Sequence, residues 1–528
     1  MSVRSNGRVL PNDSAELQND GSELPEGWKT TSLSDLLISL ESGSRPRGGV
    51  RGIVDGVPSI GGEHLNYDGT FNFESIKYVP HAFAAAMKKG RIHYRDILIV
   101  KDGATTGKTA FVGADFPHSE AFVNEHVFIC RATEKIDAEF LFRFLMCKDG
   151  QERILENFKG SAQGGINQAF ASNVQIPLAP LAEQRRIVAK LAALLAQVTT
   201  AQQRLSRIPA LLKRFRQSVL AAACSGRLTA DWREGNLTTE TGEMLLARIR
   251  QLRISNSTTA KELKQIDDAF TQDLQDVSLQ ELGMESLPET WETCRIGAVG
   301  LVCNGSTPSR QRPEYWGPST RWVSSGEVRN NCISDTREYV TQSGLAAASL
   351  RILPRGTVLI AMIGEGKTRG QSAVLEIEAT INQNIAGIIL SHGLVDSRFL
   401  WRWFQVRYEA TREAGSGSGP QALNCQRVRE LPFVLPPLAE QQEIVRRVEQ
   451  LFALADRIDS RLQAAQERVG RLTQSLLAKA FRGELVPTEA ELARQEGREY
   501  ESAEELLARL SAVPEQPATA KKKGRRQG

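Results

Sequence analysis

The chain has few of the residues that mark metal-binding, secreted and membrane proteins. Its 528 residues include only six histidines, and none has the HExxH spacing or another metal-ligand spacing. The seven cysteines form no CxxC pair, and this odd count indicates reduced thiols in a cytosolic compartment. No apolar run reaches the roughly eighteen residues of a membrane helix, and we find no signal peptide. The sequence therefore predicts a cytoplasmic protein with no metal and no membrane span.

The length and charge of the chain allow a multidomain protein with a polyanionic partner. A chain of 528 residues is too long for one core, so we expect about three or four domains. The net charge of +4 permits binding to a polyanion without requiring it. Residues 1–23 and the basic tail 514–528 are polar, and we expect both to be disordered. The tail can hold a phosphate backbone, although a terminal charge run is more often simply solvated.

The most informative feature is an internal repeat. The segment 180–188, PLAEQRRIV, returns at 437–445 as PLAEQQEIV, with seven of nine positions identical. An offset of 257 residues keeps this match gapless as far as SGRL at 225–228 and RGEL at 482–485. Two copies of one unit in a single chain indicate a pseudo-two-fold molecule.

Both copies of the repeat have the heptad pattern of a coiled-coil helix. Ten apolar positions follow spacings of four and three residues, without a polar exception in either copy. Helices related by a two-fold axis across their length run antiparallel, and the first seam spans roughly 48 Å. Pro209 predicts a kink or break in the first copy only. The alternative is two independent amphipathic helices in separate cores. The seam residues are Ile187, Leu191, Leu194, Val198, Ala201, Leu205, Ile208, Leu212, Phe215 and Val219, then Ile444, Val448, Leu451, Ala455, Ile458, Leu462, Ala465, Val469, Leu472 and Leu476.

The duplication extends to the region before each long helix. LPEGW at 24–28 matches LPETW at 287–291, and NEH at 124–126 corresponds to NQN at 382–384. Each of these two regions, called heads here, has the pattern of a mixed α and β domain. We predict buried strands at 97–100 and 358–361, and short helices at 137–144 and 396–404 with an Asp N-cap. Repeated segments at 245–249 and 506–510 predict helices that fold back on the coiled coil or dock a partner. Residues 250–286 are expected to link the halves.

The motifs that suggest catalysis are incomplete. Gly103–Thr109 is one residue short of a P-loop, and the residues after it favour a strand over the helix that phosphate binding needs. Its counterpart at 364–370 departs further from that spacing. Glu365 and Lys367 could be half of a nuclease signature, but the acidic partner residues are absent. No motif for S-adenosylmethionine binding or methyl transfer occurs. We therefore expect no catalysis by this chain alone. We expect Gly103–Thr109 to form a tight turn with exposed Lys and Thr side chains, which can contact DNA phosphates.

The remaining signal is a set of loops rich in Arg, Lys, Asn, Gln and Thr on the duplicated heads. Arg can bind guanine in a bidentate way, and Asn or Gln can bind adenine. For any single residue, a solvated loop position is an equally good interpretation, but the set favours DNA reading. The candidates are Arg45, Arg47, Arg51, Lys101, Thr105, Thr106, Lys108, Asn167, Gln168, Arg310, Arg312, Lys367, Thr368, Arg369, Gln371, Asn424 and Gln426, with Gln163 and Gln421 in the same loops.

The order of these motifs resembles the specificity subunit of type I restriction-modification enzymes. The resemblance covers nearly the whole chain. It is carried by an LPxxW entry, a variable region and a PLAEQ heptad helix that ends in SGRL or RGEL, followed by a second copy of all three. It implies an α+β protein in which two target-recognition domains are separated by a long antiparallel two-helix coiled coil.

The resemblance also implies the domain plan. The expected order is a disordered N-terminus at 1–23, target-recognition domain 1 at 24–179, spacer helix 1 at 180–228, a helical connector at 229–286, target-recognition domain 2 at 287–436, spacer helix 2 at 437–485, a C-terminal helical region at 486–513 and the basic tail at 514–528.

The implied function is phage defence as part of a larger complex. The specificity subunit binds double-stranded DNA and two modification subunits, which methylate adenine N6, and restriction subunits can join them. S-adenosylmethionine, ATP and Mg²⁺ are expected on those partners, with no cofactor on this chain. Two unlike heads imply a bipartite, asymmetric target, and the helices imply a ruler for half-sites about 34–36 Å apart. Two alternatives stay open: a stand-alone P-loop ATPase, which would hydrolyse ATP, and a coiled-coil scaffold without DNA binding.

Overall fold

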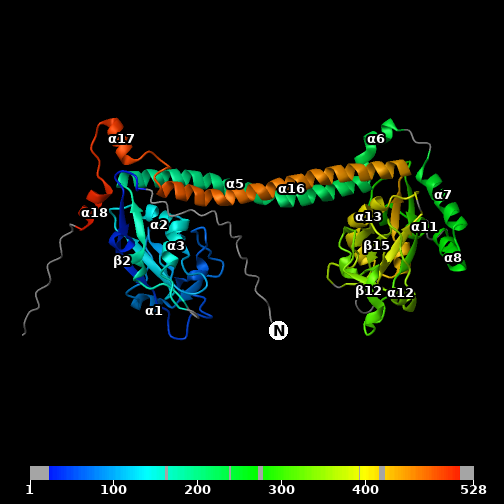
Figure 1. Ribbon diagram of the computed structural model, residues 1–528, viewed down its shortest axis with the longest axis horizontal. Helices are drawn as coiled ribbons and strands as arrows, with labels where there is room; N and C mark the ends of the chain where they lie inside the picture. Colours follow the sequence, from blue (N-terminus) through cyan, green and yellow to red (C-terminus); the bar gives the residue numbers. More distant parts are fainter. Residues whose placement is uncertain are drawn as a thin grey trace, which may run out of the picture. The chain divides into compact units, whose positions relative to one another are not determined.

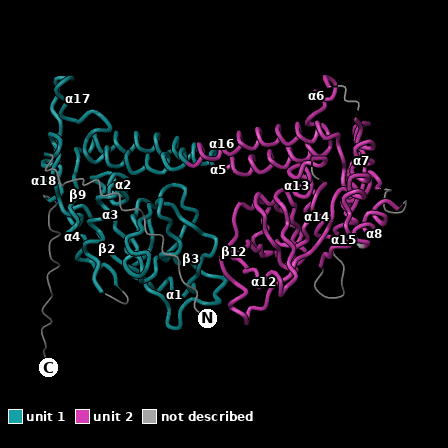
Figure 2. The backbone as a smooth tube through the Cα atoms, turned by 45° about the vertical axis from the view of Figure 1, so that its right-hand side comes forward, with its two compact units in different colours: residues 1–205, 464–528 teal, residues 206–463 magenta. Residues whose placement is uncertain are grey.

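The computed structural model describes residues 23–160, 164–236, 240–271, 277–364, 366–391, 393–414 and 422–511. The expectations for the two chain ends, and for Gln163, Glu365 and Gln421, fall outside these residues. The chain forms two compact units, one of residues 1–205 with 464–528 and one of residues 206–463 (Figure 2). Helices α5 (Leu181–Cys224) and α16 (Leu438–Phe481) each contribute one part to each unit. We call residues 24–179 head 1 and residues 287–436 head 2.

Head 1 is built from three small sheets and short helices. The sheet orders are β1-β9, β2-β8-β5-β6 and β4-β3-β7. The strands are β1 (Lys29–Ser32), β2 (Leu37–Ser42), β3 (Val57–Ile60), β4 (Lys77–Val79), β5 (Ile97–Val100), β6 (Thr109–Phe111), β7 (Phe122–Val123), β8 (Val127–Ala132) and β9 (Gln175–Leu178). The helices are α1 (His81–Ala86), α2 (Ala138–Met146), α3 (Lys148–Leu155) and α4 (Phe170–Asn173).

Head 2 repeats this plan with one additional strand, β13, at the edge of its largest sheet. The sheet orders are β10-β19, β11-β18-β15-β16-β13 and β14-β12-β17. The strands are β10 (Glu292–Arg295), β11 (Gly300–Asn304), β12 (Trp316–Val323), β13 (Asn331–Ile333), β14 (Glu338–Val340), β15 (Val358–Ala361), β16 (Ser372–Leu375), β17 (Thr380–Ile381), β18 (Ile385–Leu390) and β19 (Pro432–Leu435). The helices are α11 (Ile296–Val299), α12 (Gln342–Ala347), α13 (Ser397–Val406), α14 (Tyr408–Glu413) and α15 (Cys425–Glu430).

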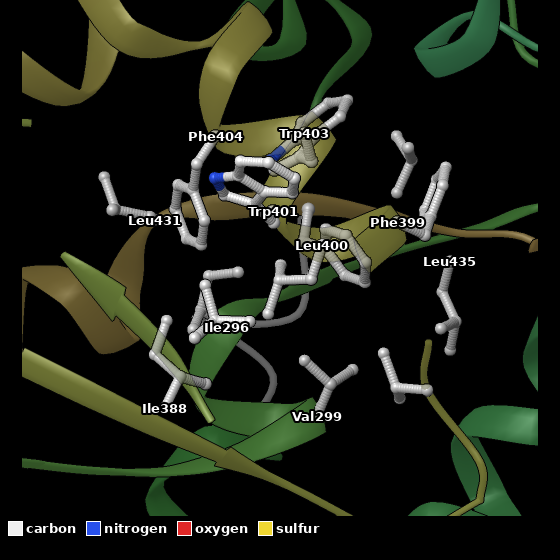
Figure 3. Packing of buried hydrophobic residues seen from close by; sticks show 14 of the residues in the cluster. Ile296, Val299, Ile388, Phe399, Leu400, Trp401, Trp403, Phe404, Leu431 and Leu435 are labelled. Atoms are coloured by element: carbon white, nitrogen blue, oxygen red, sulfur yellow. The ribbon is translucent and has the colours of Figure 1, made fainter. Parts of the chain in front are cut away.

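The sequence predictions for the core of each head are confirmed. The apolar runs at 97–100 and 358–361 are the fully buried strands β5 and β15. Asp137 and Asp396 are the N-caps of α2 and α13, where each carboxylate accepts hydrogen bonds from two backbone amides. Helix α13 then places Phe399, Trp403 and Phe404 against the sheet residues of head 2 (Figure 3).

The long helices pack side by side within each unit and run antiparallel (Figures 1 and 2). In one unit, Ile187 near the start of α5 shares a buried cluster with Phe481 at the end of α16. In the other unit, Ala223 near the end of α5 shares a cluster with Ile444 near the start of α16. The alternative of two helices in unrelated cores is therefore wrong.

Two details of the predicted coiled coil need correction. Helix α5 continues through Pro209, so the expected break is absent. Pro209 is exposed, and water can therefore solvate the carbonyl group that loses its amide partner. Leu472 is 45% exposed and Ile458 is 39% exposed, so neither is buried as predicted for a seam residue. The last turns of α16 bury Leu477 and Phe481 instead, because a straight helix drifts from a strict heptad repeat and these turns pack on α2.

The PLAEQ motif fixes each long helix to its head through fully buried side chains. The indole N–H of Trp28 donates to Glu183 (2.9 Å), and that of Trp291 donates to Glu440 (2.8 Å). The next residue of the motif, Gln184 or Gln441, accepts a hydrogen bond from the amide of the Asp that caps α2 or α13 (2.9 and 2.8 Å). These two links connect the LPxxW entry, the head and the helix, which explains why both motifs recur together.

The segments after each long helix pack on the heads. The connector forms α6 (Ala230–Gly235), α7 (Gly242–Ser255), α8 (Ala260–Ala269) and α10 (Leu279–Leu282), and the C-terminal region forms α17 (Glu489–Glu496) and α18 (Ala503–Ser511). The amide of Gly242 donates to Thr290, and the amide of Ala503 donates to Gly27, both at 2.8 Å. Leu245 and Leu506 are fully buried beneath these helices. The helices predicted at 245–249 and 506–510 are confirmed, but each packs on a head, whereas we expected it to fold back on the coiled coil or to dock a partner.

Candidate nucleic-acid interface

Four loops of head 1 meet at one place, which we call loop cluster 1: residues 43–51, 101–109, 124–126 and 164–168. The amide of Gly43 donates to the carbonyl of Asn124 (3.2 Å), and the amide of Lys101 donates to His126 (2.9 Å). The amide of Ile166 donates to the carbonyl of Lys101 (2.7 Å). The loops 43–51 and 101–109 are thereby joined to the turn between β7 and β8, and the loop 164–168 is joined to the loop 101–109.

Head 2 forms the equivalent loop cluster 2 from residues 304–312, 362–364 with 366–371, 382–384 and 422–426. The amide of Met362 donates to Asn384 (2.9 Å), and the amide of Leu423 donates to Met362 (3.0 Å). The amide of Ser306 donates to the carbonyl of Ile381 (3.1 Å). The two clusters thus share a backbone frame, although most of their side chains differ.

A glycine allows the closest approach in each frame. A Cβ atom added to Gly43 would overlap the carbonyl oxygen of Val123, and one added to Gly305 would overlap that of Ile381. Both glycines belong to the matched segments SGSRP and NGSTP. At these two positions a side chain is excluded because the backbones touch.

The electrostatics of the two clusters differ. In loop cluster 1, Arg45 pairs with Glu125 (2.6 Å), and His126 lies between Asp102 (Nδ1, 2.6 Å) and Glu125 (Nε2, 3.2 Å). Loop cluster 2 has no charge at the matching positions, where Ile363, Gln383 and Asn384 stand. There the hydroxyl of Thr307 donates to the side-chain oxygen of Gln383.

Each head also carries a cation over an aromatic ring. In head 1, Lys108 Nζ lies 4.4 Å from the ring centre of the exposed Tyr67. In head 2, the Arg310 guanidinium lies 3.7 Å from the ring centre of Trp316 and is held by Glu338. Such pairs restrict a long side chain to few rotamers, so that less entropy is lost when it binds a further group.

Comparison with known sequences identifies the family to which the two heads belong. The model of the type I restriction modification DNA specificity domain matches residues 25–210 and again residues 288–466, which is more than half of the chain. The chain belongs to this family. Each match runs from the LPxxW entry of a head into its long helix, so the chain carries two copies of the specificity domain.

Curated relatives agree with this assignment, and solved structures share the fold. The chain is 28% identical to the StySPI specificity subunit of Salmonella potsdam, over 88% of this chain and 90% of that protein. It is 28% identical to the EcoDI specificity subunit of Escherichia coli, with the same coverage. The HsdS subunit of Thermoanaerobacter tengcongensis has a similar fold, with a TM-score of 0.54, 17% identity and coverage of 88% of this chain and 98% of that one. A chain from a type I R-M system structure gives a TM-score of 0.55.

The structure shows which of the predicted DNA-contacting residues have solvent-exposed side chains and which already make hydrogen bonds within the protein. All of them except Arg369 have exposed or partly exposed side chains: Arg45, Arg47, Arg51, Lys101, Thr105, Thr106, Lys108, Asn167, Gln168, Arg310, Arg312, Lys367, Thr368, Gln371, Asn424 and Gln426. Arg369 is buried, so as placed it cannot reach a base. The residue of head 2 that matches Lys108 is Gln371 and not Lys367. The carbonyl of Lys108 accepts a hydrogen bond from the amide of Val100, the last residue of β5, and the carbonyl of Gln371 accepts one from the amide of Ala361, the last residue of β15.

The amide candidates already have structural hydrogen bonds. Asn167 accepts from the amide of Ala169 (3.0 Å), and Asn424 is the N-cap of α15, where it accepts from Arg427 (2.9 Å). Gln168 donates to the carbonyl of Leu40, and Gln426 donates to Glu430. Asn167 and Asn424 stand at matching positions, so their repeat has a structural explanation, because a local hydrogen bond uses the side-chain oxygen that would read a base. Gln168 and Gln426 are not equivalent, since Cys425 stands at the position that matches Gln168.

Sequence reasoning missed residues that only the fold brings to the clusters. Glu125, His126 and Gln383 stand in the aligned segments NEH and NQN, and this alignment is the signal that could have selected them as site residues. Tyr67 and Trp316 had no such signal, because their positions are not aromatic in the other head. The described residues contain no group of His, Cys, Asp and Glu arranged to hold a metal. A search of the same residues finds no helix with the length and apolar character to cross a membrane.

Proposed function

We propose that this chain is the DNA-recognition and scaffolding subunit of a type I restriction-modification complex. Loop cluster 1 reads one half of a bipartite DNA site, and loop cluster 2 reads the other half. The observation that supports this most strongly is the same backbone frame in both heads with different side chains upon it. A conserved frame gives both heads the same mode of docking, while different side chains give them different base preferences. The target is therefore asymmetric.

The chain itself performs no catalysis in this proposal. Lys108 leads directly into strand β6, and its ammonium group lies over Tyr67. A P-loop lysine needs a helix N-terminus beside it to bind phosphates, so this turn does not support the ATPase alternative. S-adenosylmethionine, ATP and Mg²⁺ belong to the partner subunits: two modification subunits, which methylate adenine N6, and restriction subunits where the host has them. The complex acts in the cytoplasm on the host chromosome and on phage DNA.

Helices α5 and α16 set the spacing of the two half-sites in this proposal. Ala201 and Ala465 line the same groove between the helices, so residues 197–203 and 464–470 form matched heptads in unit 1. Deleting both heptads removes about 10 Å of helix, or about three base pairs of DNA. We expect the unread spacer of the target to shorten accordingly. Deleting residues 197–203 alone is the control, since it breaks the pairing of the seams and should abolish methylation.

The decisive experiment is genome-wide mapping of N6-methyladenine. The chain is expressed with its modification subunits in a host that lacks this methylation. A single bipartite, asymmetric motif is expected, and exchange of residues 24–179 for the head of a relative should change only one half of it. A palindromic motif, or methylation without sequence preference, would contradict the proposal. Gel shifts at several salt concentrations separate it from a scaffold without DNA binding, because phosphate contacts give a steep salt dependence.

A further inference from the structure

One turn of the loop clusters has the same backbone hydrogen bonds in both heads. In head 1, the amide of Gly107 donates to the last residue of β5 (2.8 Å), whose own amide donates to Lys108 (2.9 Å). In head 2, the amide of Gly370 donates to the last residue of β15 (2.9 Å), whose own amide donates to Gln371 (2.9 Å). Lys108 and Gln371 therefore occupy the same position of the shared frame, immediately before β6 and β16.

The backbone at this position is fixed in both heads. A further hydrogen bond closes each turn, from the amide of Lys108 to Thr105 (3.1 Å) and from the amide of Gln371 to Thr368 (3.0 Å). The glycine before each of them has a left-handed φ, of 88° in head 1 and 82° in head 2. A Cβ atom added to this glycine would meet α3 in head 1 and α14 in head 2. Each turn is thus held between a strand and a helix.

The polar ends of both side chains are available to a ligand. Both side chains are partly exposed, and neither forms a hydrogen bond or an ion pair with another residue that the structure describes. The ammonium group of Lys108 lies over the ring of Tyr67 at 4.4 Å. This contact with the ring face restricts the side chain but leaves its N–H groups able to donate.

The other candidates are less suited to reading a base. Arg45 and Arg310 already pair with carboxylates, and the candidate amides other than Gln371 already have structural hydrogen bonds. Arg47 and Arg51 stand in a loop with three left-handed glycines, at each of which an added Cβ atom would meet nothing within 4 Å. Such a loosely packed loop suits phosphate contacts, which need no fixed register with the bases.

The remaining cations have no polar equivalent in the other head. In the shared frame Lys101 matches Met362, and Lys367, counted from the glycine of the turn, matches Ala104. These apolar side chains cannot read a base through hydrogen bonds. The threonine of each turn is the same residue in both heads, so it cannot give them different targets. The position of Lys108 and Gln371 combines a shared frame with two different hydrogen-bonding side chains.

The two side chains differ in the hydrogen bonds that they can form. The ammonium group of Lys108 only donates, and guanine presents two acceptors, O6 and N7, in the major groove. The carboxamide of Gln371 donates and accepts, and adenine presents N7 as an acceptor and its N6 amino group as a donor. The two purines differ at the atom on C6, so each side chain favours a different one.

We propose that this position determines base specificity in both heads: Lys108 reads a guanine of half-site 1, and Gln371 reads an adenine of half-site 2. This inference rests on the proposed function, because it names the base that each loop cluster recognises. Since the backbone frame is the same, exchange of the two side chains exchanges guanine and adenine at one position of each half-site.

The test exchanges the two side chains in the full chain, expressed with its modification subunits. N6-methyladenine is mapped for the parent chain, Lys108→Gln and Gln371→Lys. We expect Lys108→Gln to change one G·C pair of half-site 1 to A·T and to leave half-site 2 unchanged. Gln371→Lys should change one A·T pair of half-site 2 to G·C. Lys264→Gln is the control: it removes the same charge from the exposed surface of α8, outside both heads, and should leave the motif unchanged.

Fluorescence anisotropy of the purified complexes measures the size of the effect. The duplexes carry the target with either G·C or A·T at the position assigned to Lys108. The parent complex should prefer G·C about tenfold to a hundredfold, as expected for a bidentate contact, and Lys108→Gln should reverse this preference. Lys108→Ala is a second variant, which has no donor and should bind both duplexes equally. A lysine that contacts only a phosphate would instead lose the same factor of affinity for both duplexes in every variant.

The outcomes distinguish this inference from the proposed function. An unchanged motif in both exchange variants, or an equal loss of affinity for both duplexes, would overturn the assignment of Lys108 and Gln371, while a bipartite parent motif would still support DNA recognition. A parent complex that methylates and binds DNA without sequence preference would refute the proposed function itself. Circular dichroism of each variant verifies that it is folded.

Discussion

Glu440 is expected to hold head 2 to its long helix, and replacing it with Gln should release that head locally. The carboxylate is fully buried. One oxygen accepts from the indole of Trp291 (2.8 Å), and the other accepts from the hydroxyl of Thr229 (2.6 Å) and pairs with Arg233. Glu440→Gln keeps the shape of the side chain but removes its charge. It also turns an NH₂ group toward at least one of these donors.

The magnitude follows from the burial of this group. Breaking a buried ion pair by removing one partner costs about 3–5 kcal/mol. The side chain of Arg233 is 21% exposed, so water recovers part of its solvation. We therefore expect the lower end, about 3 kcal/mol, which is a factor of more than about a hundred in the local opening equilibrium.

Hydrogen exchange can test this prediction because the two units report separately. Strands β10 and β19 pair antiparallel beside Trp291, and their amides should exchange about a hundredfold faster in Glu440→Gln. The equivalent pair β1–β9 in the other unit should not change. Unchanged exchange in β10 and β19 would show that Glu440 is not the anchor.

The matched variant Glu183→Gln should increase the amide exchange rates of β1 and β9 instead, and by a smaller factor than Glu440→Gln increases those of β10 and β19. Glu183 accepts from Trp28 and from the backbone amide of Glu489 (2.8 Å). Burial raises the pKa of this carboxyl group. A raised pKa means that the folded state favours the protonated form, so the stability from this group is complete below the ordinary pKa of about 4.3 and declines as pH rises. At neutral pH the charged group thus contributes less here than at Glu440.

Three further predictions concern packing and pH. Gly305→Ala should lower the thermal unfolding temperature of head 2, since its Cβ would overlap the carbonyl oxygen of Ile381. Gly326→Ala is the control, because a Cβ there meets open space and should leave that temperature unchanged. Leu506→Ala and Leu245→Ala should each lower the free energy of unfolding by about 2–5 kcal/mol, because each removes a buried side chain. Limited proteolysis should detect faster cleavage of unit 1 in Leu506→Ala and of unit 2 in Leu245→Ala. Hydrogen bonds from Arg446 and Arg447 lower the pKa of Glu443 to about 2, so its contribution is complete above about pH 4.3 and is lost on acidification toward about pH 2. In an acid titration followed by circular dichroism, Glu443→Gln should therefore lose less stability between about pH 4.3 and about pH 2 than the parent chain does.

The repeat made much of the fold predictable. Because LPxxW and PLAEQ recur in the same order, 156 residues apart in the first half and 150 in the second, the sequence predicted two heads, two long helices and their antiparallel pairing. Apolar runs selected β5 and β15, and the Asp N-caps located α2 and α13. These features depend on local spacing and capping, so a sequence shows them directly. The heptad pattern failed at Leu472, where the last turns of α16 turn from the partner helix to head 1.

The composition of the loop clusters was decided only by the tertiary structure. Chain order alone could not show that Arg45, Glu125 and Asp102 meet around His126, because the contact depends on the pairing of β5 with β8 and on the closely packed Gly43. It also could not separate Arg369, which is buried, from the exposed Lys367. The sequence by itself determined the duplicated plan, since periodicity and repetition are properties of the chain. The reading surface required the fold, because it consists of side chains from distant loops that share only a backbone frame.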